Sequence, residues 1–170
     1  MKITNKKEAS EFLNISENEI FDFYKFPNGD WEYEDKNRYL HLYRLINNEW
    51  IELTKNINAI SVFSYCNKDW KYEDENNHEH LFRKINEEQI ELTKNVNAIN
   101  AWSHENGDWS YMDENKHEHL FREINDKWIE LTENVNTICT WSYDNEDWEY
   151  TNINKNRHLF NKNNELIKII

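Results

Sequence analysis

Residues 98–132 read AINAWSHENGDWSYMDENKHEHLFREINDKWIELT, four short apolar segments separated by polar turns. The step from Asn106 to Gly107 is the strongest short signal for a β-hairpin, because both residue types accept a left-handed backbone. The next segment alternates at the period of two that strands show. The segments are too short for helices and are rich in aromatic and β-branched residues. We expect four antiparallel strands, at residues 98–103, 109–111, 119–124 and 128–132.

This pattern recurs every 39 residues along the chain. Residues 61–99 and 100–138 are identical at 24 of 39 positions, with no gap. A tryptophan, a tyrosine two residues later and a His-Leu-aromatic trio recur in every copy. The tryptophans are Trp31, Trp70, Trp109 and Trp148. We therefore expect an all-β chain of four tandem antiparallel β-meander copies, at residues 20–60, 61–99, 100–138 and 139–170.

Tandem four-stranded units of about 40 residues resemble the repeats of β-propellers in general. Leu42-Tyr43-Arg44 and residues 50–54 look like two outer strands, and residues 57–62 look like the inner strand of the next blade. The Trp-Asp and Gly-His signatures of the best-known propeller family are not reproduced. The resemblance implies a small four-bladed β-propeller. The alternative is an open stack of repeat sheets whose ends are capped or paired with another chain.

Residues 1–19 differ from the repeat and predict a helical cap. Residues 6–13 form a short amphipathic pattern, with Thr4 or Asn5 as the N-cap. Ser16 and the glutamates that follow it could cap a second turn. The chain enters the repeat before a DNA-recognition helix could form, and such a helix would be acidic. A cap over the first copy is therefore favoured over DNA reading.

The charge balance restricts the partners. The chain has a formal net charge of −13, with 33 acidic and 20 basic side chains and no basic block. Such a chain repels nucleic-acid phosphate, so no direct nucleic-acid binding is expected, whereas a basic protein surface is a suitable partner. The chain has only two glycines and one proline, so Asn and Asp are expected to supply the turns.

The remaining composition indicates the compartment. Cys66 and Cys139 lie at different phases of the repeat, which favours two free thiols in a reducing environment. The N-terminus lacks an apolar signal region, and no run approaches the roughly 18 apolar residues of a membrane span. A cytoplasmic location without a membrane is expected.

Four histidines at one phase could form a metal site or structural hydrogen bonds. They are His41, His80, His119 and His158. In the two middle copies a second histidine two positions earlier shares the strand face, so the metal candidates are His78, His80, His117 and His119. Histidines that tie a turn Asp to a sheet are common in propellers, and this structural role is favoured. No metal and no cofactor are therefore predicted.

The Asp-Trp step in each copy has two interpretations. Carboxylate and indole together could bind a sugar, or the step could be a hairpin turn followed by a core aromatic. The residues concerned are Asp30, Trp31, Asp69, Trp70, Asp108, Trp109, Asp147 and Trp148. A second candidate binding position is variable, because Trp50 and Trp128 correspond to Gln89. Three repeated arginines, Arg44, Arg83 and Arg122, are expected to pair with the repeated glutamates Glu52, Glu91 and Glu130.

No nucleophile–base pair, phosphate-binding loop or cysteine pair at ligand spacing stands out, so an enzyme is not predicted. The favoured function is a non-catalytic, acidic protein-binding module. Such a module could inhibit a basic nucleic-acid-handling protein by charge mimicry, by analogy with phage-type anti-defence factors. The alternative is a lectin-like repeat protein with sugar sites at the Asn-x-Asp-Trp turns. Homo-oligomer formation is left open.

Overall fold

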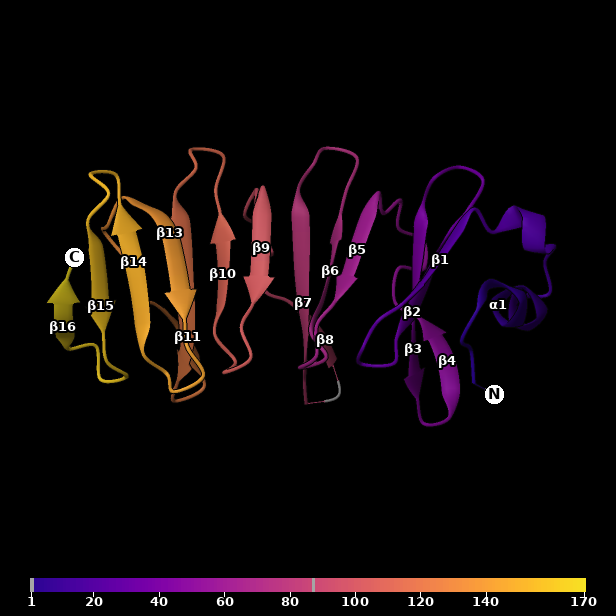
Figure 1. Ribbon diagram of the computed structural model, residues 1–170, viewed down its shortest axis with the longest axis horizontal. Coiled ribbons are helices and arrows are strands. Elements are labelled where there is room, and N and C mark those ends of the chain that lie inside the picture. Colours follow the sequence, from indigo (N-terminus) through magenta and orange to yellow (C-terminus); the bar gives the residue numbers. More distant parts are fainter. Residues whose placement is uncertain (1, 87) are drawn as a thin grey trace. The chain divides into compact units, whose positions relative to one another are not determined.

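The computed structural model describes residues 2–86 and 88–170. In this part of the chain, one α-helix, α1 (Lys6–Leu13), and one 3₁₀ turn, η1 (Glu17–Glu19), precede sixteen strands (Figure 1). Asn5 caps α1 by accepting from the Glu8 amide, and Ser16 forms a capping box with Glu19. The predicted N-terminal helix and second capped turn are therefore confirmed.

The strands form four four-stranded antiparallel meanders in chain order. The first sheet contains β1 (Asp22–Lys25), β2 (Trp31–Glu34), β3 (Leu40–Ile46) and β4 (Glu49–Glu52). The second contains β5 (Ser61–Ser64), β6 (Trp70–Glu73), β7 (Glu79–Ile85) and β8 (Glu88–Glu91). The third contains β9 (Asn100–Ser103), β10 (Trp109–Met112), β11 (Glu118–Ile124) and β12 (Lys127–Glu130). The fourth contains β13 (Thr137–Ser142), β14 (Trp148–Asn152), β15 (Arg157–Phe160) and β16 (Leu166–Ile169).

This arrangement confirms the all-β prediction of four tandem four-stranded copies. The strands of the third sheet agree with the expected segments to within two residues at each end, and the largest differences are that β9 begins at Asn100 instead of residue 98 and β12 ends at Glu130 instead of Thr132. β12 ends there because the Thr132 hydroxyl, and not a ladder carbonyl, accepts the Leu120 amide at 3.0 Å. Ring closure by the four sheets stays a prediction.

Asparagine supplies most of the left-handed turn positions, as the scarcity of glycine predicts. The hairpin between β3 and β4 uses Asn47 and Asn48, with φ of 51° and 66°. At the first turn of each copy, Gly29 and Gly107 have φ of 96° and 93°, and a non-glycine residue adopts positive φ in the other two copies. The left-handed turn is therefore retained in the two copies that lack the glycine.

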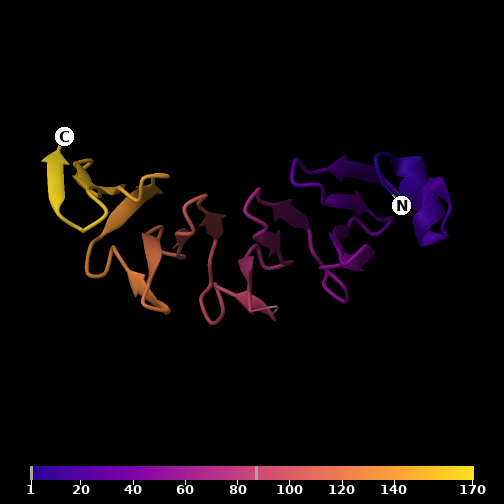
Figure 2. The same cartoon turned by 90° about the horizontal axis from the view of Figure 1, so that it is seen from below.

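The contacts divide the chain into two compact units, residues 1–77 with 82–89 and residues 78–81 with 90–170. In the first unit, Ile3, Ala9 and Ile20 are fully buried against Trp31 of the first sheet. Figure 2 shows α1 beside this sheet. The N-terminal segment therefore covers the tryptophan-bearing face of the first sheet.

A stacked pair of aromatic rings forms the centre of each sheet. The Trp31 and Tyr43 rings lie 4.4 Å apart between centroids and are nearly parallel, with an interplanar angle of 4°. The same pair of cross-strand neighbours is stacked at 4.4 Å in the other sheets: Trp70 with Phe82, Trp109 with Phe121, and Trp148 with Phe160. Such pairs stabilise an antiparallel ladder beyond the area that they bury.

The turn aspartates form buried ion pairs with the repeated arginines. Arg44 donates to Asp30 Oδ2 through Nε at 2.9 Å and through Nη2 at 2.7 Å. The equivalent pairs are Arg83 with Asp69 and Arg122 with Asp108. All three aspartates are at most 3% exposed. Each pair joins the turn before the second strand to the third strand of the same sheet.

This finding corrects the expected pairing of arginine with glutamate. In the first sheet, Glu52 lies opposite Tyr43 in the register, whereas Arg44 lies opposite Ile51. Neighbouring residues on a strand point to opposite faces, so Arg44 and Glu52 project from different faces of the sheet. The sequence spacing was compatible with a pair, but the register excludes it.

A serine from the following sheet completes each described clamp. In the first unit, the Ser64 hydroxyl donates to Asp30 Oδ2 at 2.6 Å, and the Asn28 amide donates to Ser64 Oγ and to the Tyr65 carbonyl. In the second unit the same three contacts link Asp108, Ser142, Asn106 and Tyr143. We call each set of Asp, Arg, Asn and Ser the clamp.

The fourth copy lacks the arginine of the clamp. Asn161 occupies the arginine phase, and the Asp147 carboxylate accepts from the Lys162 amide at 3.2 Å and from the Asn145 side chain at 2.9 Å. Asp147 is also partly exposed, unlike the other three turn aspartates. Asp108 and Asp147 therefore occupy the same turn position, but only Asp108 has a buried arginine as its counter-ion.

This difference gives a matched test of the clamp. We expect Asp108→Asn to lower the free energy of unfolding by about 3 kcal/mol, because it leaves the Arg122 charge buried without its partner. Asp147→Asn should cost less than about 1 kcal/mol, since no arginine depends on it. Urea denaturation of the two variants and the wild type measures both values, and equal losses would contradict the clamp.

Candidate functional site

The four Asp-Trp steps lie in the interior. The indole rings are between 0% and 5% exposed, at Trp31, Trp70, Trp109 and Trp148. Three of the four aspartates are buried in ion pairs with arginine. A ring packed on a neighbouring tyrosine or phenylalanine presents no face to a sugar. These residues therefore follow the hairpin-and-core interpretation, and they offer no stacking surface for a carbohydrate in this conformation.

The variable position on the fourth strand lies at the edge of this core. Trp50 packs edge-on against Trp31 with centroids 5.8 Å apart, and Trp128 does the same against Trp109 at 6.0 Å. In the second copy, Gln89 instead accepts a hydrogen bond from the indole nitrogen of Trp70 at 3.1 Å. The exchange of Trp for Gln thus replaces ring packing by a hydrogen bond.

Where a tryptophan occupies the fourth-strand position, the neighbouring core indole lacks the hydrogen-bond acceptor that Gln89 supplies. Within the described chain, the Nε1 groups of Trp31 and Trp109 are buried and have no hydrogen-bond partner. Trp148, in contrast, donates to Asn164 Oδ1 at 2.9 Å. Position 89 therefore varies for a reason within the fold, and its variation is not evidence of a ligand.

Three of the four repeated histidines are held by carboxylates, and the fourth, His158, has its Nε2 3.4 Å from the Asn152 side-chain amide. His41 Nδ1 lies 2.7 Å from Glu52 Oε1, its Nε2 lies 3.6 Å from Asp35 Oδ2, and its ring stacks on Tyr33 at 4.6 Å. His80 and His119 contact Glu91 and Glu130 in the same way. This geometry confirms the structural hydrogen-bonding role.

The additional histidines of the middle copies do not complete a metal cluster. His78 Nε2 lies 3.8 Å from Glu114, and the His117 amide donates to Asp113. Residues 2–86 and 88–170 contain no group of three or more His, Cys, Asp or Glu side chains arranged for a metal ion.

The His41 network makes the stability of the first unit depend on pH. Burial alone would lower the pKa of His41, but the hydrogen bond and charge of Glu52, with those of Asp35, raise it above its ordinary value. The same bond lowers the pKa of Glu52. A histidine with a raised folded pKa stabilises the protein fully below its unfolded pKa, and this contribution is lost as the pH rises through the folded pKa.

We therefore expect the difference in unfolding free energy between wild type and Glu52→Gln to be largest near pH 6 and to shrink as the pH rises toward 8. Urea titrations at pH 6, 7 and 8 measure this difference. A difference that is constant over this interval would show that the His41–Glu52 contact carries no proton-linked stability.

The structure exposes apolar residues on the first strand of each sheet, a feature that the sequence analysis missed. The first strand of each sheet is an edge strand, and an apolar residue at or just before its start is followed three positions later by an aromatic one. We call these residues the edge pairs: Phe21 and Tyr24, Ile60 and Phe63, Ile99 and Trp102, and Ile138 and Trp141. All but Trp102 are between 37% and 59% exposed. The repeat itself could have revealed them, because the apolar character recurs at both phases in every copy.

Within the first unit, the exposed rings of Tyr24 and Phe63 both contact Phe26, which is buried at 4% exposure. Phe26 contacts Tyr24 with centroids 5.0 Å apart and Phe63 at 5.7 Å, and Phe63 in turn contacts Tyr65 at 4.8 Å. These contacts run from the first sheet to the second. The exposed rings of Tyr24 and Phe63 are therefore held by one buried ring that bridges the two sheets.

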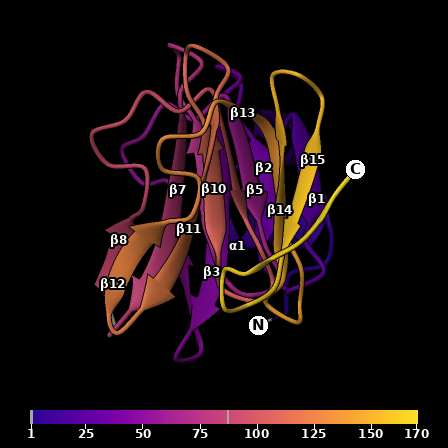
Figure 3. The ribbon, with the colours of Figure 1, turned by 90° about the vertical axis from the view of Figure 1, so that its left-hand side faces the viewer.

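A second exposed apolar edge lies in the fourth sheet. Figure 3 shows β14 and β15 side by side, and β16 pairs with the outer side of β15. Every residue of β16 is exposed, and its apolar members Leu166, Ile167 and Ile169 are at least 50% exposed. An uncovered strand of this kind can pair with another strand.

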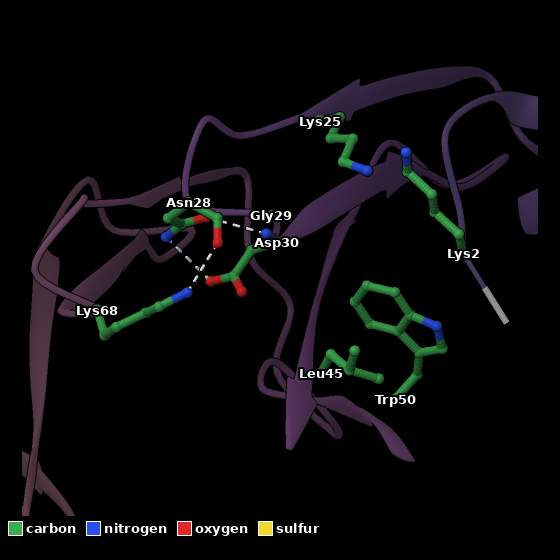
Figure 4. Close-up of a pocket in the computed structure, with 8 residues that line it drawn as sticks. All are labelled: Lys2, Lys25, Asn28, Gly29, Asp30, Leu45, Trp50 and Lys68. Atoms are coloured by element: carbon green, nitrogen blue, oxygen red, sulfur yellow. Dashed lines mark hydrogen bonds between the residues drawn. The ribbon is translucent and has the colours of Figure 1, made fainter. Parts of the chain in front are cut away.

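A basic pocket of about 470 Å³ lies in the first unit (Figure 4). Lys2, Lys25 and Lys68 line it together with Trp50. Two of the ammonium groups hold the backbone, because Lys25 donates to the Ile3 carbonyl at 2.9 Å and Lys68 to the Asn28 carbonyl at 2.7 Å. These lysines therefore tie the N-terminal segment and the second sheet to the first.

Comparisons with known proteins identify no family. No family model matches the chain, and no curated protein matches its sequence. Among solved structures, one titled "YCF48 bound to D1 peptide" is similar, with 6% identity and a TM-score of 0.48. The match covers 89% of this chain and 53% of the other, so the chain spans about half the length of that protein. Likeness at this level carries no information on function.

Two further findings concern the surface chemistry. Cys66 and Cys139 are free and exposed, as predicted. No helix in the described residues is long and apolar enough to span a membrane.

Proposed function

We propose that this chain is a non-catalytic protein-binding module whose edge pairs contact a basic partner protein. The observation that carries this proposal is the recurrence of the edge pairs in all four copies. The core does not require them, since the inward positions of the same strands are already filled, for example by Val62 and Ala101, which are 8% and 0% exposed. Repetition of exposed apolar residues is best explained by selection for contact.

The charge distribution supports a basic partner. Three of the arginines, Arg44, Arg83 and Arg122, are held in the clamps, with side chains no more than 14% exposed. Their positive charge is therefore masked by the aspartates, while the chain keeps its net charge of −13. A strongly acidic chain favours basic surfaces and accelerates their association at low salt.

We further propose that the partner is a nucleic-acid-handling protein. Nucleic-acid-handling proteins present extended basic surfaces, and an acidic module can occupy such a surface by charge mimicry. We therefore place inhibition of such a protein, as in phage-type anti-defence factors, ahead of carbohydrate binding. The lectin alternative has lost the exposed tryptophan faces on which it depended.

The test is a pull-down from the native host with the full chain as bait. Phe63→Ser combined with Trp141→Ser should reduce recovery of the partner at least about tenfold, because both exposed rings leave the contact surface. Ile129→Ser is the matched control: Ile129 is 43% exposed, close to Phe63 at 46%, but lies on an outer strand. It should leave recovery unchanged.

The recovered protein then decides between the outcomes. A basic protein whose recovery falls as salt is raised, and whose nucleic-acid binding the wild-type chain competes away, supports the proposal. Equal recovery by the double variant and the wild type would contradict the role of the edge pairs. A partner that binds equally well in high salt would contradict the electrostatic part.

A further inference from the structure

The second unit contains a pocket at the junction between the third and fourth copies. It has a volume of about 330 Å³, lies between the third and fourth sheets, and is predominantly apolar. Its principal apolar walls are Trp102, Met112, Ile138 and Trp141. The carboxylate of Glu118, on β11, is among the few polar groups that line it.

Glu118 is a buried carboxylate without a cationic partner. The residue is only 6% exposed. Its Oε2 accepts the Thr140 amide at 2.8 Å, and its Oε1 lies 3.4 Å from the Ser110 hydroxyl. No Lys or Arg in the described chain pairs with it. Such a carboxylate is costly to bury while ionised, because its remaining lone pairs face apolar surroundings.

The second and fourth copies carry a base at one of the two positions that Ser110 and Glu118 occupy in the third copy, whereas the first copy carries Glu32 and Leu40. In the fourth copy the phases of Ser110 and Glu118 are occupied by Glu149 and Arg157, and the Arg157 Nε donates to Glu149 Oε2 at 2.6 Å. In the second copy the same phases carry Lys71 and Glu79. The second and fourth copies thus carry one acid and one base at these two repeat positions. The third copy carries the acid Glu118 and, in place of a base, Ser110.

We infer that the pocket around Glu118 is a binding site for an organic ammonium ion with a short apolar stem, such as an alkylamine or a lysine side chain. The ligand would supply the cation that Ser110 does not. Trp102, Ile138 and Trp141 of this pocket are also edge-pair residues, but the inference rests on the Glu118 carboxylate, which the proposed function does not use.

The pocket chemistry fits this ligand class. A carboxylate attracts the ammonium group and accepts its N–H donors, and the Trp102 and Trp141 rings can contact both the cation and the methylene stem. Burial raises the pKa of Glu118 above its ordinary value, against the opposing hydrogen bonds from Thr140 and Ser110. A bound cation would stabilise the ionised form and relieve that cost.

The other titratable groups near the pocket do not replace the ligand. His104 Nε2 lies 3.4 Å from the Ser110 hydroxyl. Glu149 is paired with Arg157, and His119 is hydrogen-bonded to Glu130, although its charge also acts to lower the pKa of Glu118. Cys139 has a raised pKa, first because of burial and then because of Glu118 and Glu149, so it contributes no charge of its own near neutral pH.

The test uses n-butylammonium chloride as the probe and n-butanol as its neutral counterpart. Each is titrated into the ¹⁵N-labelled full chain at pH 7.5 and constant ionic strength, and the indole N–H signals of Trp102 and Trp141 are followed. We expect saturable shifts with the ammonium ion and at least about tenfold weaker binding of the alcohol, the ratio that one charge-assisted hydrogen bond can supply. Equal binding of both probes, or no saturable shift, would overturn the inference.

Three variants localise the effect. Glu118→Gln keeps an acceptor for the Thr140 amide but removes the charge, and should weaken butylammonium binding at least about tenfold. Ser110→Lys restores the base found at this phase in the second copy and should abolish binding. Glu79→Gln is the matched control, since Glu79 accepts the Ala101 amide at 2.5 Å just as Glu118 accepts that of Thr140. It should leave binding unchanged.

The Ser110→Lys variant keeps the test decisive if Glu118→Gln does not fold. Retained binding in Ser110→Lys, or the same loss in Glu79→Gln, would overturn the assignment to Glu118. A parallel titration with N-acetyl-lysine N-methylamide separates the ligand sources. Binding as tight as that of butylammonium favours a lysine side chain, and at least about tenfold weaker binding favours a free amine. No partner protein is needed, so failure here leaves the proposed function untouched.

Discussion

The clamp is the interaction on which the rest of this structure depends. A buried carboxylate such as that of Asp30 satisfies an arginine of its own sheet and a serine of the next, so one side chain fixes both a hairpin and the packing of two sheets. Breaking one partner would leave an uncompensated buried charge, which is among the most destabilising single changes. The clamp also removes arginines from the surface and so shapes the charge that a partner meets.

The copies use one framework but distribute their charges differently. Where Arg44 stands in the first copy, the fourth copy has Asn161, and its Asp147 is partly exposed. The fourth copy carries the ion pair of Glu149 and Arg157 at two positions that Ser110 and Glu118 occupy in the third copy. Because the backbone of each copy is nearly the same, such exchanges change the local electrostatics without changing the fold. The functional differences between copies therefore lie at these few phases.

The sequence analysis predicted the elements well because their signals are local. Gly107 supplies the left-handed residue of the turn, Asn106 accepts the Asp108 amide through its side chain, and the alternation after Trp109 requires nothing from distant residues. The pairing of Arg44 with Glu52 was wrong because it depends on register: a shift of one residue along a strand moves a side chain to the opposite face. The sugar-binding interpretation of Trp31 depended on its exposure, and exposure is set by residues far away in the sequence.

By itself, the sequence determined the number of copies, the strand order within each copy, the turns formed by asparagine and the N-terminal helix, because each of these follows from periodicity and backbone preference. Only the tertiary structure decided which aspartate meets which arginine, that the tryptophans are interior, and that the edge pairs are exposed. It also brought the Glu118 carboxylate of β11 beside the Thr140 amide of β13, 22 positions further along the chain. Such contacts arise when sheets pack face to face, and no local pattern encodes which side chains then share a pocket.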